Sequence, residues 1–357
     1  MSGDGAFHMM TVVDVVRDAE DSVVISLDPG AELMRFVHGQ HLTLRRFFDD
    51  VEVRRSYSIC SAAPDGPLRV AIRRVAGGTF STWANESIAV GDRIEVMAPA
   101  GHFTHELDPD ASRRYTLLAA GSGITPVLSI MATILEREQR SMVDLLYVNR
   151  TSRSTMLLED LEDVRDRHLG RVRISYLFTR EPTQAELLSG RPDRERLDAL
   201  VAAGLLPADV DQAFLCGPLE LTNLAREALL AAGLPSDRIH RELFTGAQLG
   251  SPPPMAPRAV DDTMSVVANG SGKLHGRASD IDFYEGDSVL DAMQRVRPDT
   301  PFSCRSGVCS TCQAKLVSGT VEMAVNYGLE DDDLARGYVL TCQARPTSAV
   351  VSVDYDV

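Results

Sequence analysis

Apolar and polar positions alternate through much of the first hundred residues. Two alternating runs flank a polar turn in MTVVDVVRDAEDSVVISLDP (residues 10–29), and further runs occupy LRVAIRRVAGG (68–78) and DRIEVMAPAG (92–101). Period-two alternation bounded by Gly and Pro is typical of half-buried antiparallel strands. The pattern therefore predicts a small antiparallel β-barrel or sandwich over residues 1–108, and we favour the barrel.

The rhythm changes near residue 113, where short apolar runs begin to alternate with longer stretches of helical periodicity. Strand-like runs are RYTLLAAGSG (114–123), MVDLLYVNR (142–150), VRISYLFTR (172–180) and DQAFLCGP (211–218). Helix-like stretches follow at ITPVLSIMATILEREQR (124–140), STMLLEDLEDVRDRH (154–168) and LELTNLAREALLAAG (219–233). Strictly alternating strands and helices predict an α/β domain with a parallel sheet over 109–248.

A proline-rich segment divides this region from the rest of the chain. SPPPMAPRA (251–259) has four prolines in nine residues, which a helix or a central strand does not tolerate. We predict a linker over 249–262. The last predicted domain, 263–357, contains strand-like runs such as AVVSVDYDV around one helix-like stretch, SVLDAMQRV, and is of the α+β class.

The net charge and the lack of a recognisable targeting segment limit the expected partners and location of the protein. The 36 basic and 51 acidic side chains give a net charge of −15, which disfavours nucleic acid or an anionic membrane as partner. Neither a signal peptide nor a long apolar span is apparent, so we expect a cytoplasmic protein. Clustered cysteines in a reducing compartment bind metal more often than they form disulfides.

Four of the six cysteines form a spaced set. Four, two and 29 residues separate Cys304, Cys309, Cys312 and Cys342. This is the plant-type spacing of a [2Fe–2S] cluster, with three ligands in one tight loop and the fourth far along the chain. Zinc is the alternative, but zinc sites usually come as two separated Cys-x-x-Cys pairs, and here there is one.

Two stretches in the β-rich region, RRSYSIC (54–60) and GGTFSTW (77–83), are similar to the flavin-binding segments of the ferredoxin–NADP reductase family. The resemblance implies that Arg55 pairs with a flavin pyrophosphate, that Tyr57 lies along the flavin and that Ser58 reaches its reactive edge, roles that these side chains can fill chemically. GGTFSTW (77–83) is a Gly-rich turn that opens a helix, whose amides suit a pyrophosphate. The same resemblance implies cofactor contacts at Gly77, Gly78, Ser81 and Thr82 as well.

The alternating region supplies a candidate nicotinamide site. GSGITP (121–126) follows a buried strand and opens a helix, so its backbone can approach a pyrophosphate. YVNRTSRS (147–154) contains no acidic residue for a ribose hydroxyl, while Arg150 and Arg153 can hold a 2′-phosphate. We therefore favour NADPH over NADH.

The resemblance implies further roles in this region. It places Cys216 of LCGP (215–218) at the nicotinamide ring, where hydride leaves, and sets Glu242 and Phe244 of RIHRELFTG (238–246) near the flavin. With Ser58, these give three candidate catalytic residues: Ser58, Cys216 and Glu242. The remaining candidate coenzyme contacts are Gly121, Gly123, Thr125, Pro126, Asn149 and Gly217.

The module order, flavin then nicotinamide then plant-type ferredoxin, resembles reductase components of bacterial multicomponent oxygenases. YVNRTSRSTMLLEDLEDVRDRH and GTVEMAVNYGLEDDDLARGYVLTCQARP are similar to reductases of phenylacetyl-CoA epoxidase, a di-iron oxygenase of phenylacetate catabolism. The resemblance implies FAD, a β-grasp-like ferredoxin domain and an oxygenase as electron acceptor. Reductases of Rieske-type ketosteroid or aromatic-ring hydroxylases are the alternative. A non-catalytic redox sensor is disfavoured, because a sensor does not need an intact hydride site.

Overall fold

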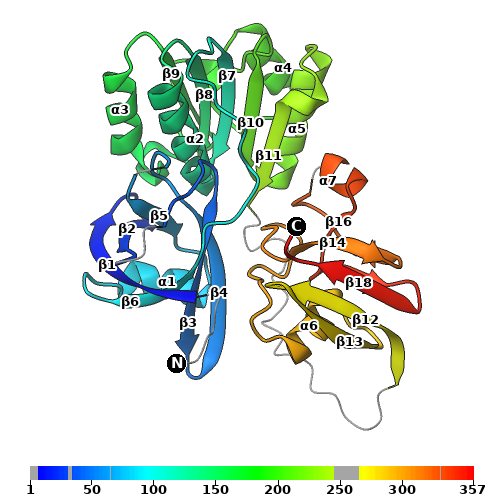
Figure 1. Cartoon of the computed structure of the whole chain (residues 1–357). Helices are drawn as coiled ribbons and strands as arrows, with labels where there is room; N and C mark the ends of the chain where they lie inside the picture. Colours follow the sequence, from blue (N-terminus) through cyan, green and yellow to red (C-terminus); the bar gives the residue numbers. More distant parts are fainter. Residues whose placement is uncertain (1–6, 31–33, 65, 245–264, 330) are drawn as a thin grey trace. The chain divides into compact units, whose positions relative to one another are not determined.

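The computed structural model of the chain describes residues 7–30, 34–64, 66–244, 265–329 and 331–357 (Figure 1). These residues form two compact units, each described by itself below. One contains the described residues of 8–44 and 57–248, and the other contains Phe7 and the described residues of 45–56 and 249–357. The predicted linker over 249–262 lies outside the described residues.

An antiparallel sheet occupies the β-rich region. Its strand order is β4-β3-β6-β1-β2-β5. The strands are β1 (Phe7–Arg17), β2 (Ser22–Asp28), β3 (His41–Phe48), β4 (Val51–Ser58), β5 (Leu68–Arg73) and β6 (Arg93–Met97). Helix α1 (Thr79–Glu86) follows β5. Leu68, Val70 and Ile72 of β5 are buried, as the alternating pattern predicted, and the small side chain of Ala71 between them is buried as well.

A parallel sheet in the order β11-β10-β7-β8-β9 follows. Its strands are β7 (Arg114–Ala120), β8 (Met142–Asn149), β9 (Val172–Phe178), β10 (Gln212–Gly217) and β11 (Ile239–Leu243). Its helices are α2 (Ile124–Arg137), α3 (Leu158–Arg167), α4 (Arg194–Ala202) and α5 (Leu219–Ala231), with short 3₁₀ turns η1 (Gly121–Gly123), η2 (Ser152–Ser154), η3 (Glu186–Leu188) and η4 (Ser236–Arg238). Helices α2 and α3 pack on one face and α4 and α5 on the other, which confirms the predicted α/β class (Figure 1).

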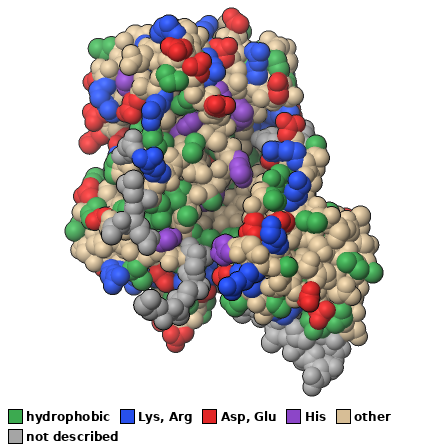
Figure 2. Space-filling model, in the orientation of Figure 1, with side chains coloured by type: hydrophobic (Ala, Val, Ile, Leu, Met, Phe, Trp, Pro, Cys, Tyr) green, Lys and Arg blue, Asp and Glu red, His purple; other side chains and the backbone are tan. Residues whose placement is uncertain are grey.

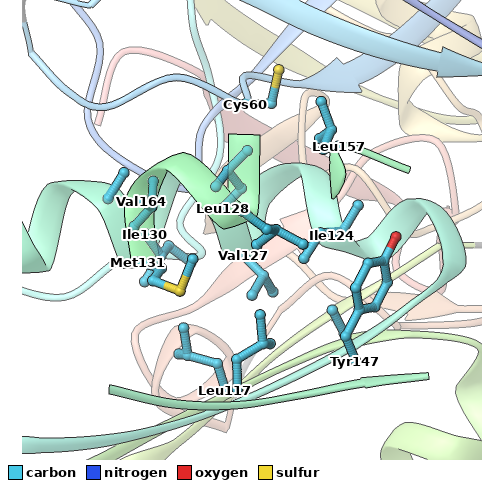
Figure 3. Packing of buried hydrophobic residues seen from close by; sticks show 14 of the residues in the cluster. Cys60, Leu117, Ile124, Val127, Leu128, Ile130, Met131, Tyr147, Leu157 and Val164 are labelled. Atoms are coloured by element: carbon cyan, nitrogen blue, oxygen red, sulfur yellow. The ribbon is translucent and has the colours of Figure 1, made fainter. Parts of the chain in front are cut away.

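The principal core lies under α2. Every residue of this helix from Ile124 to Leu135 is buried, because the sheet covers one side and the barrel the other. Figure 3 shows side chains of α2 lying over Leu117 and Tyr147 of the sheet, with Cys60 of the barrel also within this cluster. The shared core joins barrel and sheet into one unit, so the loops that bear candidate residues rest on rigid elements.

The C-terminal module has a mixed five-stranded sheet in the order β13-β12-β18-β14-β16, and a two-stranded one, β15-β17. Its strands are β12 (Val266–Leu274), β13 (Arg277–Tyr284), β14 (Gln313–Ser318), β15 (Val321–Met323), β16 (Tyr338–Leu340), β17 (Ala344–Pro346) and β18 (Val350–Asp354). Its helices are α6 (Val289–Val296) and α7 (Asp331–Ala335). A capping box between Ser288 and Asp291 starts α6, which packs on the sheet and confirms the α+β class.

Candidate functional site

The carboxyl edge of the parallel sheet holds a glycine cradle at the start of α2. Gly121 has a φ of 55°, and no side chain caps the helix N-terminus at Gly123. A Cβ on Gly123 would lie 2.4 Å from the carbonyl oxygen of Cys216, so the end of β10 touches the backbone here. Gly217 has a φ of 155°, and a Cβ there would lie 2.8 Å from the Ala120 Cβ. Uncapped helix amides behind side-chain-free backbone are what a pyrophosphate requires.

Two further predicted residues shape this helix start. Thr125 Oγ donates to Ser122 O at 3.0 Å, which tightens the turn into the helix. Pro126 is buried in the first turn of α2, a position where a missing N–H leaves no helical hydrogen bond unmade. Thr125 and Pro126 therefore stabilise the conformation of the glycine cradle. Neither presents an exposed polar group to a coenzyme.

Ser58, Cys216 and Glu242 meet at the ends of three strands. The parallel register of β10 and β11 sets Cys216 beside Glu242, and Ser58 Oγ donates a long hydrogen bond of 3.5 Å to Glu242 Oε2. The Glu242 side chain keeps some exposure, but its carboxyl is enclosed by protein, and this burial raises its pKa to about 8. Burial likewise raises the pKa of Cys216. At pH 7 the trio thus presents a neutral thiol, a hydroxyl and a protonated carboxyl.

Phe244 is the first residue after β11, the strand that carries Glu242. Its N–H donates to Gly217 O at 3.2 Å, and its ring packs against the core cluster that contains Cys216. The sequence predicted both Glu242 and Phe244 near a flavin. The structure brings them to the same strand end as Cys216 and Ser58.

The predicted ribose site lies where β8 and β9 end. Asn149 is 4% exposed, and neither its amide nitrogen nor its amide oxygen has a hydrogen-bond partner among the described residues. The Tyr147 hydroxyl lies close by but donates to the carbonyls of Gly121 and Met156. The buried carboxamide of Asn149 thus has unpaired donors and an unpaired acceptor. It fits a site in which a bound polar ligand supplies the missing hydrogen bonds.

The two predicted arginines differ in their surroundings. Arg150 is exposed and forms no ion pair with any residue that the structure describes, whereas Arg153 Nε lies 2.9 Å from Glu20 Oε1. Arg180, which the sequence motifs did not identify, has its backbone N–H bonded to Arg150 O at 2.8 Å. Pairing of β8 with β9 thus adds a second exposed arginine beside Arg150, a neighbour that only the strand order reveals.

An acidic residue also reaches this turn, contrary to the expectation from the local sequence. Glu181 Oε2 accepts hydrogen bonds from Ser152 N at 2.7 Å and Ser152 Oγ at 2.9 Å. The expectation considered residues 147–154 alone, and Glu181 enters from the segment after β9. Because both its hydrogen bonds go to Ser152, the carboxylate orders the turn that bears Arg150 and Arg153.

The predicted flavin residues lie on β4 and at the start of α1. Arg55 is exposed, and the Tyr57 ring lies 5.6 Å from that of Phe80. Gly77 has a φ of 72°, and no side chain caps α1 at Gly78, so this helix start also suits an anion. Ser81 is buried and its hydroxyl bonds Val75 N and Gly78 O, which gives it a role in the turn. The Thr82 N–H donates a hydrogen bond to Gly78 O at 3.0 Å, so it too belongs to this turn.

The cysteine loop is strained in a way that exposes its amides. Arg305, Gly307 and Ser310 have φ values of 51°, 75° and 52°. A Cβ on Gly307 would lie 3.0 Å from Val325 and 3.1 Å from Gln343, so glycine is needed for space as well as conformation. The N–H groups of Ser306 and Cys309 both point at Cys304 Sγ, at 3.4 Å. Such inward amides stabilise negative charge on sulfur.

The four thiols fall into two pairs. The pKa of Cys304 lies well below its usual value because the Cys309 thiol donates to it, and the pKa of Cys342 is lowered in the same way by Cys312. Among the described residues, no group of three or more ligand side chains converges on one point. Two pairs of sulfurs suit two irons better than a single tetrahedral ion, so the residues fit a [2Fe–2S] cluster.

A separate cavity of about 600 Å³ opens beside Cys60, between the segment 60–67 and helices α2 and α3. None of the predicted coenzyme residues lines it. Burial raises the pKa of Cys60 to about 12, so this thiol stays protonated and serves packing.

Several histidines in the same unit as the cradle are buried or partly buried and uncharged at neutral pH. Burial lowers the pKa of His38, His41 and His240 to about 4 in each case. On the face drawn in Figure 2, histidines are visible among interspersed acidic and basic side chains. That face therefore carries no large patch of one charge. No helix in the described part of the chain is both long and apolar enough to cross a membrane.

Comparison with known families gives one match to each region. Residues 9–105 match the oxidoreductase FAD-binding domain, 117–227 the oxidoreductase NAD-binding domain, and 273–347 the 2Fe-2S iron-sulfur cluster binding domain. The matched regions follow one another in the order that the sequence predicted.

Relatives match over nearly their whole length. The chain is 40% identical to a component of the 1,2-phenylacetyl-CoA epoxidase of Escherichia coli K12, over 98% of both chains. It is 34% identical to the ferredoxin reductase component of 3-ketosteroid-9-alpha-monooxygenase of Mycobacterium tuberculosis, over 99% of this chain and 97% of the relative. The structure of phthalate dioxygenase reductase shares the fold, with a TM-score of 0.59, 23% identity and 98% coverage of both chains. The chain thus belongs to the family of oxygenase reductases that join an FAD-binding, an NAD-binding and a [2Fe–2S] ferredoxin domain.

Proposed function

We propose that this reductase draws electrons from NADPH and delivers them to a di-iron oxygenase that epoxidises phenylacetyl-CoA. The observation that carries the proposal is the 40% identity to the Escherichia coli epoxidase component over 98% of both chains. Hydride brings two electrons at once, whereas an oxygenase takes them singly. FAD and the cluster, when bound, supply the conversion from paired to single electrons.

The chain's own residues have distinct tasks in this proposal. Arg55 and the amides at Gly77 and Gly78 hold the FAD pyrophosphate, and Tyr57 lies along the ring system. The cradle from Gly121 to Gly123 holds the NADPH pyrophosphate. Cys216 closes the space beneath the nicotinamide ring.

Ser58 and Glu242 hold a proton at the reactive edge of the flavin. The carboxyl of Glu242 is protonated below its pKa of about 8 and is hydrogen-bonded to Ser58. A proton can therefore move between the two oxygens without crossing solvent. Cys304, Cys309, Cys312 and Cys342 hold the cluster.

Preference for NADPH rests on the arginines at the ends of β8 and β9. Arg150→Ala should raise KM for NADPH at least tenfold while KM for NADH changes little, because the lost guanidinium faces only the 2′-phosphate. Steady-state kinetics with both coenzymes measures the ratio. Arg167→Ala, an exposed arginine on α3, is the matched control and should leave the ratio unchanged. An unaltered ratio in Arg150→Ala would remove the basis for NADPH preference.

Reductase for a ketosteroid hydroxylase is the second candidate, supported by the 34% identity of the mycobacterial relative. Reconstitution separates the two. The purified chain is mixed with NADPH and either phenylacetyl-CoA with a di-iron epoxidase, or a ketosteroid with its Rieske-type hydroxylase. Coupled NADPH oxidation and epoxide formation in the first mixture alone support the proposal. Product formation in the second mixture alone would replace it by the hydroxylase function.

A further inference from the structure

Gln343 directly follows Cys342, and its backbone is held from two sides. Its N–H donates to Leu340 O at 2.8 Å, and its carbonyl oxygen accepts from Ala324 N at 3.1 Å. Its side chain packs on the cysteine loop, since a Cβ on Gly307 would lie 3.1 Å from Gln343 Cγ. The fixed backbone and the close packing on Gly307 hold the side-chain amide against the loop.

The side-chain amide of Gln343 donates two hydrogen bonds at the cysteine site. Nε2 lies 2.8 Å from the Arg305 carbonyl oxygen and 3.7 Å from Cys342 Sγ. A carbonyl oxygen only accepts, so the nitrogen of the carboxamide, and not its oxygen, must face Arg305. The two hydrogens on Nε2 thus serve one acceptor each, a backbone oxygen of the loop and the sulfur of the fourth cysteine.

The hydrogen bond to Arg305 O also affects a second sulfur. Arg305 has a φ of 51°, a conformation that a residue with a side chain keeps only when its surroundings hold it. The peptide unit that begins with the Arg305 carbonyl ends with the Ser306 N–H, which points at Cys304 Sγ at 3.4 Å. Because a peptide unit is planar, an anchor on its carbonyl oxygen fixes the direction of its N–H. Gln343 therefore contacts one cysteine sulfur directly and orients an amide toward another.

We propose that Gln343 raises the reduction potential of the cluster, by donating a hydrogen bond to Cys342 Sγ and by orienting the Ser306 N–H toward Cys304 Sγ. The inference rests on the proposed cluster ligands and concerns a residue outside that set. Neutral donors stabilise the more negative, reduced state more than the oxidised state, because a sulfur that carries more charge accepts more strongly. Gln343 is thus a positioning residue, and it forms no bond to iron.

The test is a redox titration of the intact protein followed by EPR of the reduced cluster. Gln343→Leu keeps the approximate size of the side chain and removes both donors. The equilibrium constant for one-electron reduction of the cluster should fall about tenfold, as expected for the loss of one hydrogen bond to a charged acceptor, and the potential should be about 59 mV lower. The flavin potential and the iron and sulfide content should match those of the unaltered protein.

Gln313→Leu is the matched control. Gln313 follows Cys312 directly, as Gln343 follows Cys342, but its side chain forms no hydrogen bond to a sulfur in the described part of the chain. Its amide oxygen is buried without a partner among the described residues. The control variant therefore removes the same polar group from the same module and should leave the potential unchanged.

A second measurement detects the hydrogen bond to sulfur itself. The protein is labelled with the heavy nitrogen isotope in its glutamine side-chain amides, reduced and studied by pulsed EPR. The cluster spin should couple to one such nitrogen. The coupling should disappear in Gln343→Leu and persist in Gln313→Leu. If Gln343→Leu does not retain its cluster, the coupling in the other two proteins decides the matter.

A Gln343→Leu protein with full cluster content and an unshifted potential would overturn the proposal, and so would an equal shift in Gln313→Leu. Absence of a glutamine nitrogen coupling in the unaltered protein, or its loss in Gln313→Leu, would overturn it too. Absence of a reduced [2Fe–2S] signal in the unaltered protein would instead refute the cluster ligands themselves.

Discussion

Cys309→Ser is expected to abolish reduction of a protein acceptor while most NADPH-dependent ferricyanide reduction remains. Cys309 lies in the strained loop, and its backbone N–H and thiol both point at Cys304. Its loss removes one ligand of an iron as well as the partner of Cys304, whereas the flavin site draws on other residues. Ferricyanide can take electrons directly from the flavin, so only the later transfer should fail.

The two activities are measured on the same preparation, with flavin content and iron content determined for each protein. Cys60→Ser is the matched control, because Cys60 is buried outside the cysteine set and its thiol bonds only Arg69 O. It should retain both activities. Equal loss of both activities in Cys309→Ser, with flavin content intact, would contradict a serial path from flavin to cluster.

Glu242→Gln is expected to slow reoxidation of the reduced flavin by one-electron acceptors about 10²-fold, the lower end of what a positioned proton acceptor contributes. Delivery of hydride to a bound flavin balances without a proton, whereas withdrawal of the electrons one at a time releases a proton that glutamine cannot accept. In the unaltered protein the rate of this reoxidation should rise as the pH rises through about 8, because Glu242 then loses its own proton and can accept the one from the flavin. The variant should lack that step.

Stopped-flow absorbance of the flavin across the pH range measures both effects. Glu227→Gln, on the exposed face of α5, is the control and should retain the rate and the pH step. A Glu242→Gln protein with the rate and pH profile of the unaltered chain would remove Glu242 from the proton path.

The central strands of the parallel sheet were predictable because β7 and β10 are buried on both faces and read as nearly continuous apolar runs. The start of α3 was placed too early. The run STML was read as helix, but Thr151 and Ser154 form a capping box around η2, and Leu157 has a φ of 55°. Helix α3 therefore begins at Leu158, since local side-chain hydrogen bonds held the preceding turn.

Residues within short motifs were predictable, and residues supplied by neighbouring strands were not. The cysteine spacing and the glycines at 121 and 123 are local patterns. Arg180 and Glu181 reach the turn after β8 only because β9 lies beside it. Strand order and register are tertiary properties that no local pattern in one sequence specifies.

The contact between Gly123 and the backbone of Cys216 bears on which properties of the protein can be engineered independently of one another. The backbone of Cys216 fills the space where a Gly123 side chain would be, so under the proposed function the position of the coenzyme pyrophosphate depends on the same backbone as the position of Cys216. Among the described residues, the arginines in the turn after β8 and at the end of β9 form no hydrogen bond or ion pair with the cradle, which is linked to that turn by the Tyr147 hydroxyl between Gly121 O and Met156 O. Coenzyme choice should therefore be open to redesign at Arg150 and Arg180, while any library that varies Gly123 would lose binding and chemistry together.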